Sequence, residues 1–115
     1  MSIMVASLVG ENCLTIEDGQ NIYELIHSDL LHEKEVTLDF TGVQVFASPF
    51  FNTAIGQLLR DISPETLNKY LHVESLTVYG NQVLRRVILN AQKYYKEPHI
   101  RRAVDDALLG AVGTA

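Results

Sequence analysis

Apolar runs and turn residues alternate over the first sixteen residues of the chain. Residues 3–9 form an apolar, partly β-branched run, residues 10–12 (Gly-Glu-Asn) are typical of a turn, and residues 13–16 can return as a second short strand. This pattern predicts an opening hairpin of two antiparallel strands.

A pattern of helical spacing begins after Asp18. We predict that Asp18 caps a helix that continues through Leu31. Apolar residues recur there at intervals of three and four, with polar residues between them: Ile22, Leu25, Ile26 and Leu30. This helix should bury one face. Residues 36–40 (VTLDF) predict a strand that ends at a Thr-Gly pair, and residues 43–46 can continue extended before the next helix.

A second helix, predicted from residue 51 onward, has the clearest apolar stripe of the chain: Ala54, Ile55, Leu58, Leu59 and Ile62. Ser63-Pro64 ends it, because a residue before proline disfavours the helical conformation. Residues 72–76 suggest another short strand. Two further helices follow, one closed by Pro98 and one over residues 100–109. Their apolar residues are Val83, Leu84, Val87, Ile88 and Ala91 in the first, and Ile100, Val104, Ala107 and Leu108 in the second.

The order of these candidates predicts an α/β fold. Strand, helix, strand, helix, strand, helix favours a largely parallel sheet with crossover helices. We expect a small single-domain sandwich with a mixed, mainly parallel four-stranded sheet, the opening hairpin and three to four helices. The 115 residues, 47% of them apolar, suffice for one compact core. The domain should span residues 1–110, with residues 111–115 as a frayed C-terminal tail.

The charges are unevenly distributed along the chain. The formal net charge of −5 argues against a generally basic, nucleic-acid-binding surface. Six of the nine Lys and Arg residues nevertheless lie between positions 85 and 102: Arg85, Arg86, Lys93, Lys96, Arg101 and Arg102. With Tyr94 and Tyr95 between them, Arg85, Arg86, Lys93, Arg101 and Arg102 can supply contacts to nucleic acid. The alternative is a solvated helix face, because adjacent residues such as Arg85 and Arg86 point about 100° apart.

Sequence motifs for catalysis or cofactors are not found. The glycine-containing segments lack the spacing of phosphate-binding loops, and the histidines lack the i, i+4 spacing of metal pairs. Cys13, the only cysteine, is predicted to be a small buried group whose pKa is raised by nearby Glu11 and Glu17. We therefore expect no cofactor, no metal, no catalytic residue and no enzymatic activity.

The chain also lacks signals for export or membrane insertion. Its apolar start has no preceding basic region, and no run approaches the roughly 18 apolar residues that a membrane span needs. A single cysteine suits a reducing compartment. We expect a cytoplasmic protein.

Ser48-Pro49 lies where the second helix should begin. A serine at the N-cap accepts a hydrogen bond from a first-turn amide, and a proline at the next position wastes no donor. The start of a helix also favours negative charge, so a phosphate on Ser48 would be well placed there. A structural cap and a regulatory switch are both compatible with this residue.

Residues 36–59, VTLDFTGVQVFASPFFNTAIGQLL, resemble the core of the STAS domain of sulfate transporters and anti-sigma-factor antagonists. In that domain an LDxSGV-like strand end leads into a serine-bearing turn and then a helix. The segment is still more similar to the bacterial STAS-like family of unknown function, whose pattern resembles LDFSGV followed by serines, phenylalanine and a helix. The LDFTGV sequence, residues 38–43, includes the two motif-supporting residues Asp39 and Gly42.

The resemblance implies roles for two residues of this segment. In anti-sigma-factor antagonists a partner kinase phosphorylates a serine at this turn, which releases the partner, and the matching residue here is Ser48. Where those antagonists carry aspartate, a second serine or threonine, and glycine, this chain has Ala47, Pro49 and Phe50. Asp39 is expected to accept hydrogen bonds from the Thr41-Gly42 turn or from loop amides near Ser48, with a ligand-facing role as the alternative.

The function implied by the resemblance is that of a non-catalytic regulatory domain that binds a protein partner through residues 45–52. The partner would be a kinase-like ATPase or another regulator. The predicted partner-binding residues are Phe46, Phe50, Phe51 and Asn52, although at least one of the phenylalanines should be core. The alternative is a nucleic-acid-associated accessory protein that binds through residues 85–102. Whether the domain forms a homodimer stays open.

Overall fold

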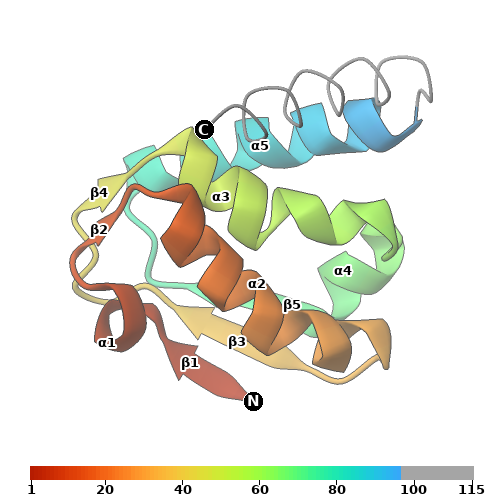
Figure 1. The fold of residues 1–115 in the computed structure, drawn as a ribbon, viewed down its shortest axis with the longest axis horizontal. Coiled ribbons are helices and arrows are strands. Elements are labelled where there is room, and N and C mark those ends of the chain that lie inside the picture. Colours follow the sequence, from red (N-terminus) through yellow and green to blue (C-terminus); the bar gives the residue numbers. More distant parts are fainter. Residues whose placement is uncertain (97–115) are drawn as a thin grey trace.

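The computed structural model describes residues 1–96, which fold as three parallel strands with helices stacked over one face (Figure 1). The strands lie in the order β1 (Ser2–Met4), β3 (Val36–Asp39) and β5 (Leu71–Glu74). Their side chains alternate between the two faces. Ile3 and Leu38 are buried towards the helices, whereas the opposite face carries polar residues such as His72 and Glu74. The predicted α/β class, largely parallel sheet and single compact domain are confirmed.

The predicted opening hairpin is wrong. After β1 the apolar run turns into a short helix, α1 (Val5–Val9), and β2 (Asn12–Cys13) pairs in parallel with β4 (Val45–Phe46) rather than with β1. β1 instead pairs in parallel with β3, with Ile3 opposite Leu38. This pairing places Ile3 in the common core, and Val5 is fully buried just beyond the strand. The expected four-stranded mixed sheet is therefore a three-stranded parallel sheet and a separate two-stranded parallel ladder.

Helix α2 (Ile16–Leu31) confirms the first predicted helix, with a different cap. The N-cap is Thr15, whose hydroxyl oxygen accepts a hydrogen bond from the backbone N–H of Asp18 at 3.0 Å. Asp18 lies in the first helical turn, where its negative charge suits the helix dipole. Of the predicted apolar stripe, Leu25 is half exposed, and the rest is buried: Ile22, Ile26 and Leu30.

The second predicted helix is interrupted. Helix α3 (Ser48–Ala54) ends at Ile55, whose φ of −122° leaves the helical range, and the chain continues as a 3₁₀ helix, η1 (Gly56–Arg60). The predicted apolar stripe is nevertheless buried throughout: Ala54, Ile55, Leu58, Leu59 and Ile62. The Ser-Pro pair after the stripe also begins a further helix, α4 (Pro64–Tyr70), which the sequence did not predict. The Ser63 hydroxyl caps α4 by accepting from the backbone N–H of Thr66 at 3.1 Å.

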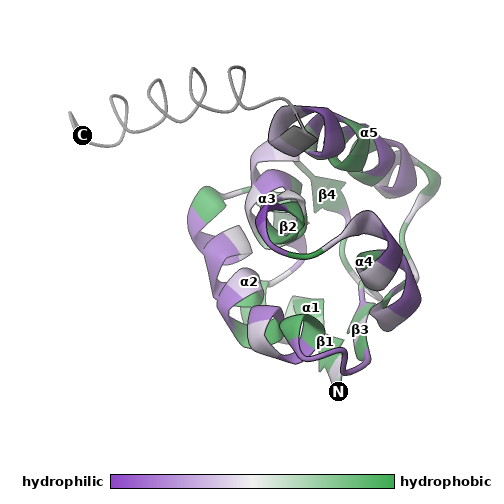
Figure 2. Ribbon diagram, turned by 90° about the vertical axis from the view of Figure 1, so that its right-hand side faces the viewer, coloured by the Kyte–Doolittle hydropathy of each residue, from purple (hydrophilic) through white to green (hydrophobic). Residues whose placement is uncertain are grey.

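The remaining elements match their predicted places. β5 confirms the strand expected near residues 72–76, and α5 (Val78–Lys96) contains the predicted third apolar stripe. Figure 2 shows helices that carry green apolar and purple polar residues in alternation, as amphipathic helices do. Pro98, which was predicted to close the preceding helix, the helix expected over residues 100–109 and the tail at residues 111–115 lie outside the described residues.

The close crossing of α2 and α3 depends on Gly19. A Cβ atom added at this position would lie 2.6 Å from the Phe50 carbonyl oxygen and 2.9 Å from the Thr53 Cβ. Both neighbours belong to α3, and one of them is backbone, so neither can move aside without shifting the helix. A glycine inside α2 thus lets two helices approach backbone to backbone.

We predict that Gly19→Ala destabilises the domain by about 1–3 kcal/mol, because overpacking at this crossing outweighs the better helix propensity of alanine. Urea unfolding followed by circular dichroism measures the effect. Asn21→Ala, on the exposed side of the same helix, is the matched control and should leave stability nearly unchanged. A Gly19→Ala protein as stable as wild type would contradict the close α2–α3 crossing.

Candidate functional site

Asp39, the last residue of β3, fixes the turn that follows this strand. Its carboxylate accepts hydrogen bonds from the Thr41 hydroxyl (2.6 Å) and from the Thr41 backbone N–H (2.9 Å). These two bonds, the hydroxyl first, hold the pKa of the Asp39 carboxyl below its ordinary value, and a hydrogen bond from Ser75 lowers it further. The predicted hydrogen bonds from the Thr41-Gly42 turn to Asp39 are therefore present.

Gly42 allows the chain to reverse in this turn. The backbone N–H of Val43 donates to the Phe40 carbonyl at 3.0 Å, and Gly42 has a φ of +85°, a conformation that glycine adopts without steric cost. Val43 is then buried, which anchors the far side of the turn. The motif-supporting role predicted for Gly42 thus has a backbone reason.

The chain next runs into β4 and is held against the N-terminal segment by backbone hydrogen bonds. The N–H of Gln44 donates to the Glu11 carbonyl at 2.8 Å, and the N–H of Ala47 donates to the Cys13 carbonyl at 2.9 Å. These bonds flank the short β2–β4 ladder. They fix the place at which α3 begins, and with it the place of Ser48.

Ser48 is the first residue of α3, and it is not the cap that the sequence predicted. The N-cap is Ala47, which has an extended conformation (φ −130°, ψ 145°) and whose carbonyl accepts from the backbone N–H of Phe50 at 3.1 Å. No side chain caps α3. Pro49, which was predicted at the first position of the helix, is therefore at its second position. The Ser48 side chain is exposed, so its hydroxyl is accessible from solvent.

The three phenylalanines predicted to anchor a partner are core residues instead. Phe46 is 3% exposed, and Phe50 and Phe51 are fully buried. Phe46 stacks on Phe51 with ring centroids 5.6 Å apart, and both rings contact Phe40, at 6.0 and 5.9 Å. Their removal from water supports the fold and leaves no ring surface for a partner. Of the four predicted partner-binding residues, only Asn52 is exposed.

Other apolar side chains are exposed on the segments that adjoin β4. Val45 alternates with buried Phe46 on β4, and Leu14 follows buried Cys13 at the end of β2. Val78 and Tyr79, 76% and 58% exposed, lie in the first turn of α5. A Cβ added at Gly80 would lie 3.0 Å from the Phe46 ring, so this turn packs directly against β4.

We call these four residues, together with Ser48, the β4 surface: Leu14, Val45, Ser48, Val78 and Tyr79. The sequence carried a partial signal for it, since the period of two in a strand turns Val45 outward if Phe46 points inward. This signal is weak, because β4 has only two residues and both Val45 and Phe46 are apolar. Val78 and Tyr79 could not be assigned to this surface from the sequence, because the place of α5 beside β4 depends on contacts between residues far apart in the chain.

The basic residues that were predicted to contact nucleic acid are only partly within the described chain. Arg85, Arg86 and Lys93 are exposed on α5, whereas Arg101 and Arg102 lie outside the described residues. The rings of Tyr94 and Tyr95 contact each other edge to face at 4.6 Å, and both side chains are half-buried. Nucleic-acid binding by this stretch stays a prediction.

Cys13 is buried, and burial raises the pKa of its thiol to about 12, with a smaller contribution from the charge of Asp18. The sequence predicted the direction correctly but attributed it to Glu11 and Glu17. The thiolate form that a nucleophile needs is therefore rare at neutral pH.

Two histidines of the described chain, His27 and His72, pair with carboxylates at the surface. His27 Nε2 lies 2.8 Å from an Asp61 carboxylate oxygen, and His72 Nε2 lies 3.5 Å from one of Glu35. Within residues 1–96, no three His, Cys, Asp or Glu side chains are placed to hold a metal ion. Over the same residues, no helix combines the length and apolar character that crossing a bilayer requires.

We predict that Thr41→Val raises the pKa of Asp39 towards its ordinary value, because the largest cause of its depression is the Thr41 hydroxyl. Side-chain carboxyl NMR across an acid titration measures this pKa. The depressed pKa means that Asp39 stabilises the fold above its unfolded-state pKa and loses this effect as the pH falls through its folded-state pKa. Ser75→Ala, which removes the weakest of the three donors, should give a smaller rise. Equal effects of both variants would contradict the assignment of the Thr41 hydroxyl as the largest cause of the lowered Asp39 pKa.

The comparison with protein families matches residues 18–81, more than half of the chain, to the STAS-like domain of unknown function. The match includes the Asp39 turn, Ser48, all of α3 and β5, and α2 from its third residue onward. Neither the comparison with curated proteins nor that with solved structures gave a match. The parallel α/β architecture is consistent with this match. The chain belongs to the family of STAS-like domains of unknown function.

Proposed function

We propose that this chain is a non-catalytic regulatory domain that binds a protein partner through the β4 surface, as an anti-sigma-factor antagonist would. The observation that carries the proposal is that large apolar side chains are exposed on three segments that adjoin one another, β2, β4 and the first turn of α5. Exposed apolar groups of this size are candidates for contact with a partner. The partner is a kinase-like ATPase or another regulator.

The β4 surface has a rigid base. Phe46 follows the outward-facing Val45 in β4 and points to the buried side of the strand, where its ring stacks on Phe51 of α3. Gly80 holds the first turn of α5 against the same ring. Side chains that are already ordered lose little conformational entropy on binding, which favours affinity. Tyr79 is the best anchor candidate, because tyrosine is enriched among the residues that dominate binding energy.

Ser48 is suited to regulate this surface. Its hydroxyl is exposed and is not used to cap α3. Phosphorylation would add a charge of about −1.5 to −2 beside apolar side chains that a partner must desolvate. The cost of burying that charge opposes binding. Phosphorylation of Ser48 therefore acts as a release signal in this proposal.

A non-catalytic role is supported by the chemistry of the described residues. Cys13 is buried with a raised thiol pKa, and the carboxylate of Asp39 is occupied by its own turn. The imidazole of His27 is paired with Asp61. Across residues 1–96, we identify no nucleophile and base within hydrogen-bond reach of each other that also face a cavity.

The first test is affinity capture from the native cells, with mass spectrometry to identify captured proteins and Ser48 phosphorylation. Wild type and Ser48→Ala should capture the same partner, and Ser48→Glu should lose it. Tyr79→Ala should weaken binding of the purified partner by about 2 kcal/mol, or roughly 30-fold, as truncation of an interface anchor does. Val45→Ser should weaken it in the same direction.

Leu31→Ser is the matched control for Val45→Ser, since Leu31 is exposed to the same degree at the far end of α2. It should not alter binding. Equal capture by wild type and Ser48→Glu would exclude the switch, and full affinity in Val45→Ser and Tyr79→Ala would exclude the surface. Binding that falls steeply with salt and with charge reversal at Arg101 and Arg102 would instead favour the nucleic-acid alternative.

A further inference from the structure

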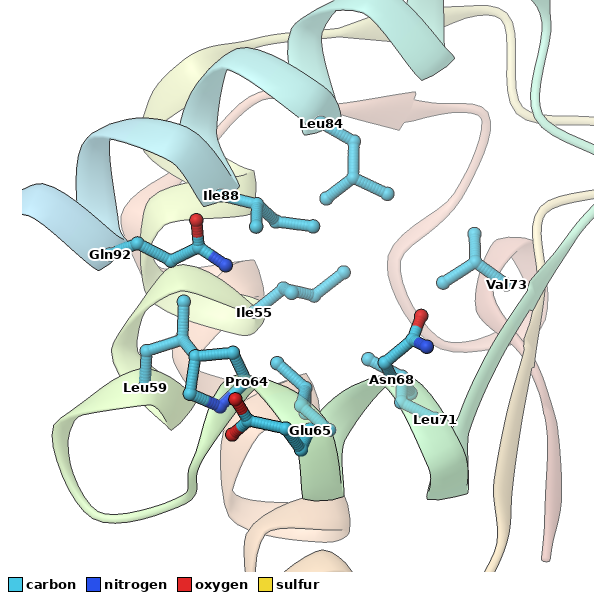
Figure 3. A pocket seen from close by; sticks show the side chains of 11 residues that line it. Ile55, Leu59, Pro64, Glu65, Asn68, Leu71, Val73, Leu84, Ile88 and Gln92 are labelled. Atoms are coloured by element: carbon cyan, nitrogen blue, oxygen red, sulfur yellow. The ribbon is translucent and has the colours of Figure 1, made fainter.

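A second surface feature lies away from the β4 surface, on the side of α4 (Figure 3). A groove of about 400 Å³ lies between α4 and α5, with η1 and β5 contributing to its walls. Its lining is mainly apolar: Ile55, Leu59, Pro64, Leu67, Leu71, Val73, Leu84 and Ile88. The polar lining residues are Glu65, Asn68 and Gln92. The composition suits an apolar occupant with a polar outer side.

The groove borders an unpaired strand edge. β5 is the last strand in the order β1-β3-β5, so its outer edge has no neighbour in the three-stranded sheet. Native proteins cover or interrupt such edges, because an exposed edge invites pairing with other chains. An occupant of the groove would lie beside this edge and protect it.

One wall of the groove is formed by α5. Figure 3 shows Leu84, Ile88 and Gln92 along α5, with Glu65 and Asn68 of α4 on the opposite wall. The eight steps from Leu84 to Gln92 span about 12 Å of helix. Gln92 lies about one turn before Lys96, the last described residue of α5. Only residues 97–99 separate Lys96 from residue 100, so a segment that starts there is tethered close to this wall.

The sequence beyond α5 has the pattern that this groove requires. Residues 100–109 carry Ile100, Val104, Ala107 and Leu108 at helical spacing, with Arg102 and Asp106 on the opposite side of that pattern. Ten residues of helix span about 15 Å, which is comparable with the roughly 12 Å of α5 between Leu84 and Gln92. Residues 97–99 include Pro98, and proline ends helices, so the chain can reverse between the two segments.

The charges are compatible with this occupant. Glu65 lines the groove on the α4 side. Arg101 adjoins the apolar side of the helical pattern, near the start of residues 100–109, so its guanidinium group can lie beside this carboxylate. At an exposed site such a pair contributes only about 0–1 kcal/mol, and the apolar side chains supply most of the affinity.

We propose that residues 100–109 of this chain dock in the groove between α4 and α5, antiparallel to α5, with Ile100, Val104 and Leu108 against its apolar lining. The docked segment forms a helical hairpin with α5 and covers the free edge of β5. This inference concerns a different surface from the proposed partner site and does not depend on it.

The test uses the full chain with Cys13→Ala and a spin label on Asn68→Cys, at the groove. Amide NMR signals of residues 100–109 should be lost through paramagnetic broadening. The same label on Asn12→Cys, in β2, should leave them intact. Val104→Gln should restore the signals in the groove-labelled protein, whereas Asp106→Gln, on the polar side of the segment, should not.

Signals of residues 100–109 that stay intact with the label on Asn68→Cys would overturn the proposal. A sample that mixes isotope-labelled protein without a spin label and spin-labelled protein without isotopes separates intramolecular from intermolecular docking. Broadening of the same strength in that mixture would show that a second copy supplies the segment, which would also overturn it. Loss of the signals in both Val104→Gln and Asp106→Gln would exclude docking through the apolar side.

Discussion

The contact among four phenylalanine rings is the interaction on which the rest of the structure depends. Phe40 directly follows β3, Phe46 lies on β4, and Phe50 and Phe51 lie in α3, with neighbouring centroids 5.5–6.0 Å apart. Each buried ring stabilises the fold by about 1.5–3 kcal/mol through its removal from water. The same four rings join the sheet, the β2–β4 ladder and α3. Because these rings hold the end of β3 in place, the hydrogen bonds of the Asp39 turn have a fixed strand end to build on.

This cluster also determines which residues are available for function. Because Phe46 points inward, the preceding residue Val45 points outward, and Gly80 lets the first turn of α5 pack against the Phe46 ring. The family motif, residues 38–43, contains the buried residues at the end of β3 and the Asp39 turn. The side chains that differ from anti-sigma-factor antagonists, Ala47 and Pro49, shift the cap of α3 to the backbone and leave the Ser48 hydroxyl exposed.

The parallel sheet has two unlike faces, which explains why function should be sought on the helical side and at the ends of the elements. Parallel strands are usually covered on both faces. Here the outer face of the three described strands carries polar residues, among them Thr37, His72 and Glu74, and His72 approaches Glu35. These side chains keep that face soluble without a second helical layer. Among the places where apolar residues meet solvent are the β4 surface and the α4–α5 groove.

The sequence by itself determined the helical stripes, the places of α2, β3, β5 and α5, the Asp39 turn and the family, because each depends on neighbours within a few residues. Only the tertiary structure decided the rest, including α1 and α4. The run from Ile3 suits a hairpin or a parallel strand equally, and pairing with β3 prevails because it buries Ile3 and Val5 in the common core. Ser63-Pro64 suits both the end and the start of a helix. Which phenylalanines are buried was likewise undetermined, since residues 40–51 show neither a strand nor a helix period throughout, and the choice depends on contacts with distant residues such as Gly19 and Gly80.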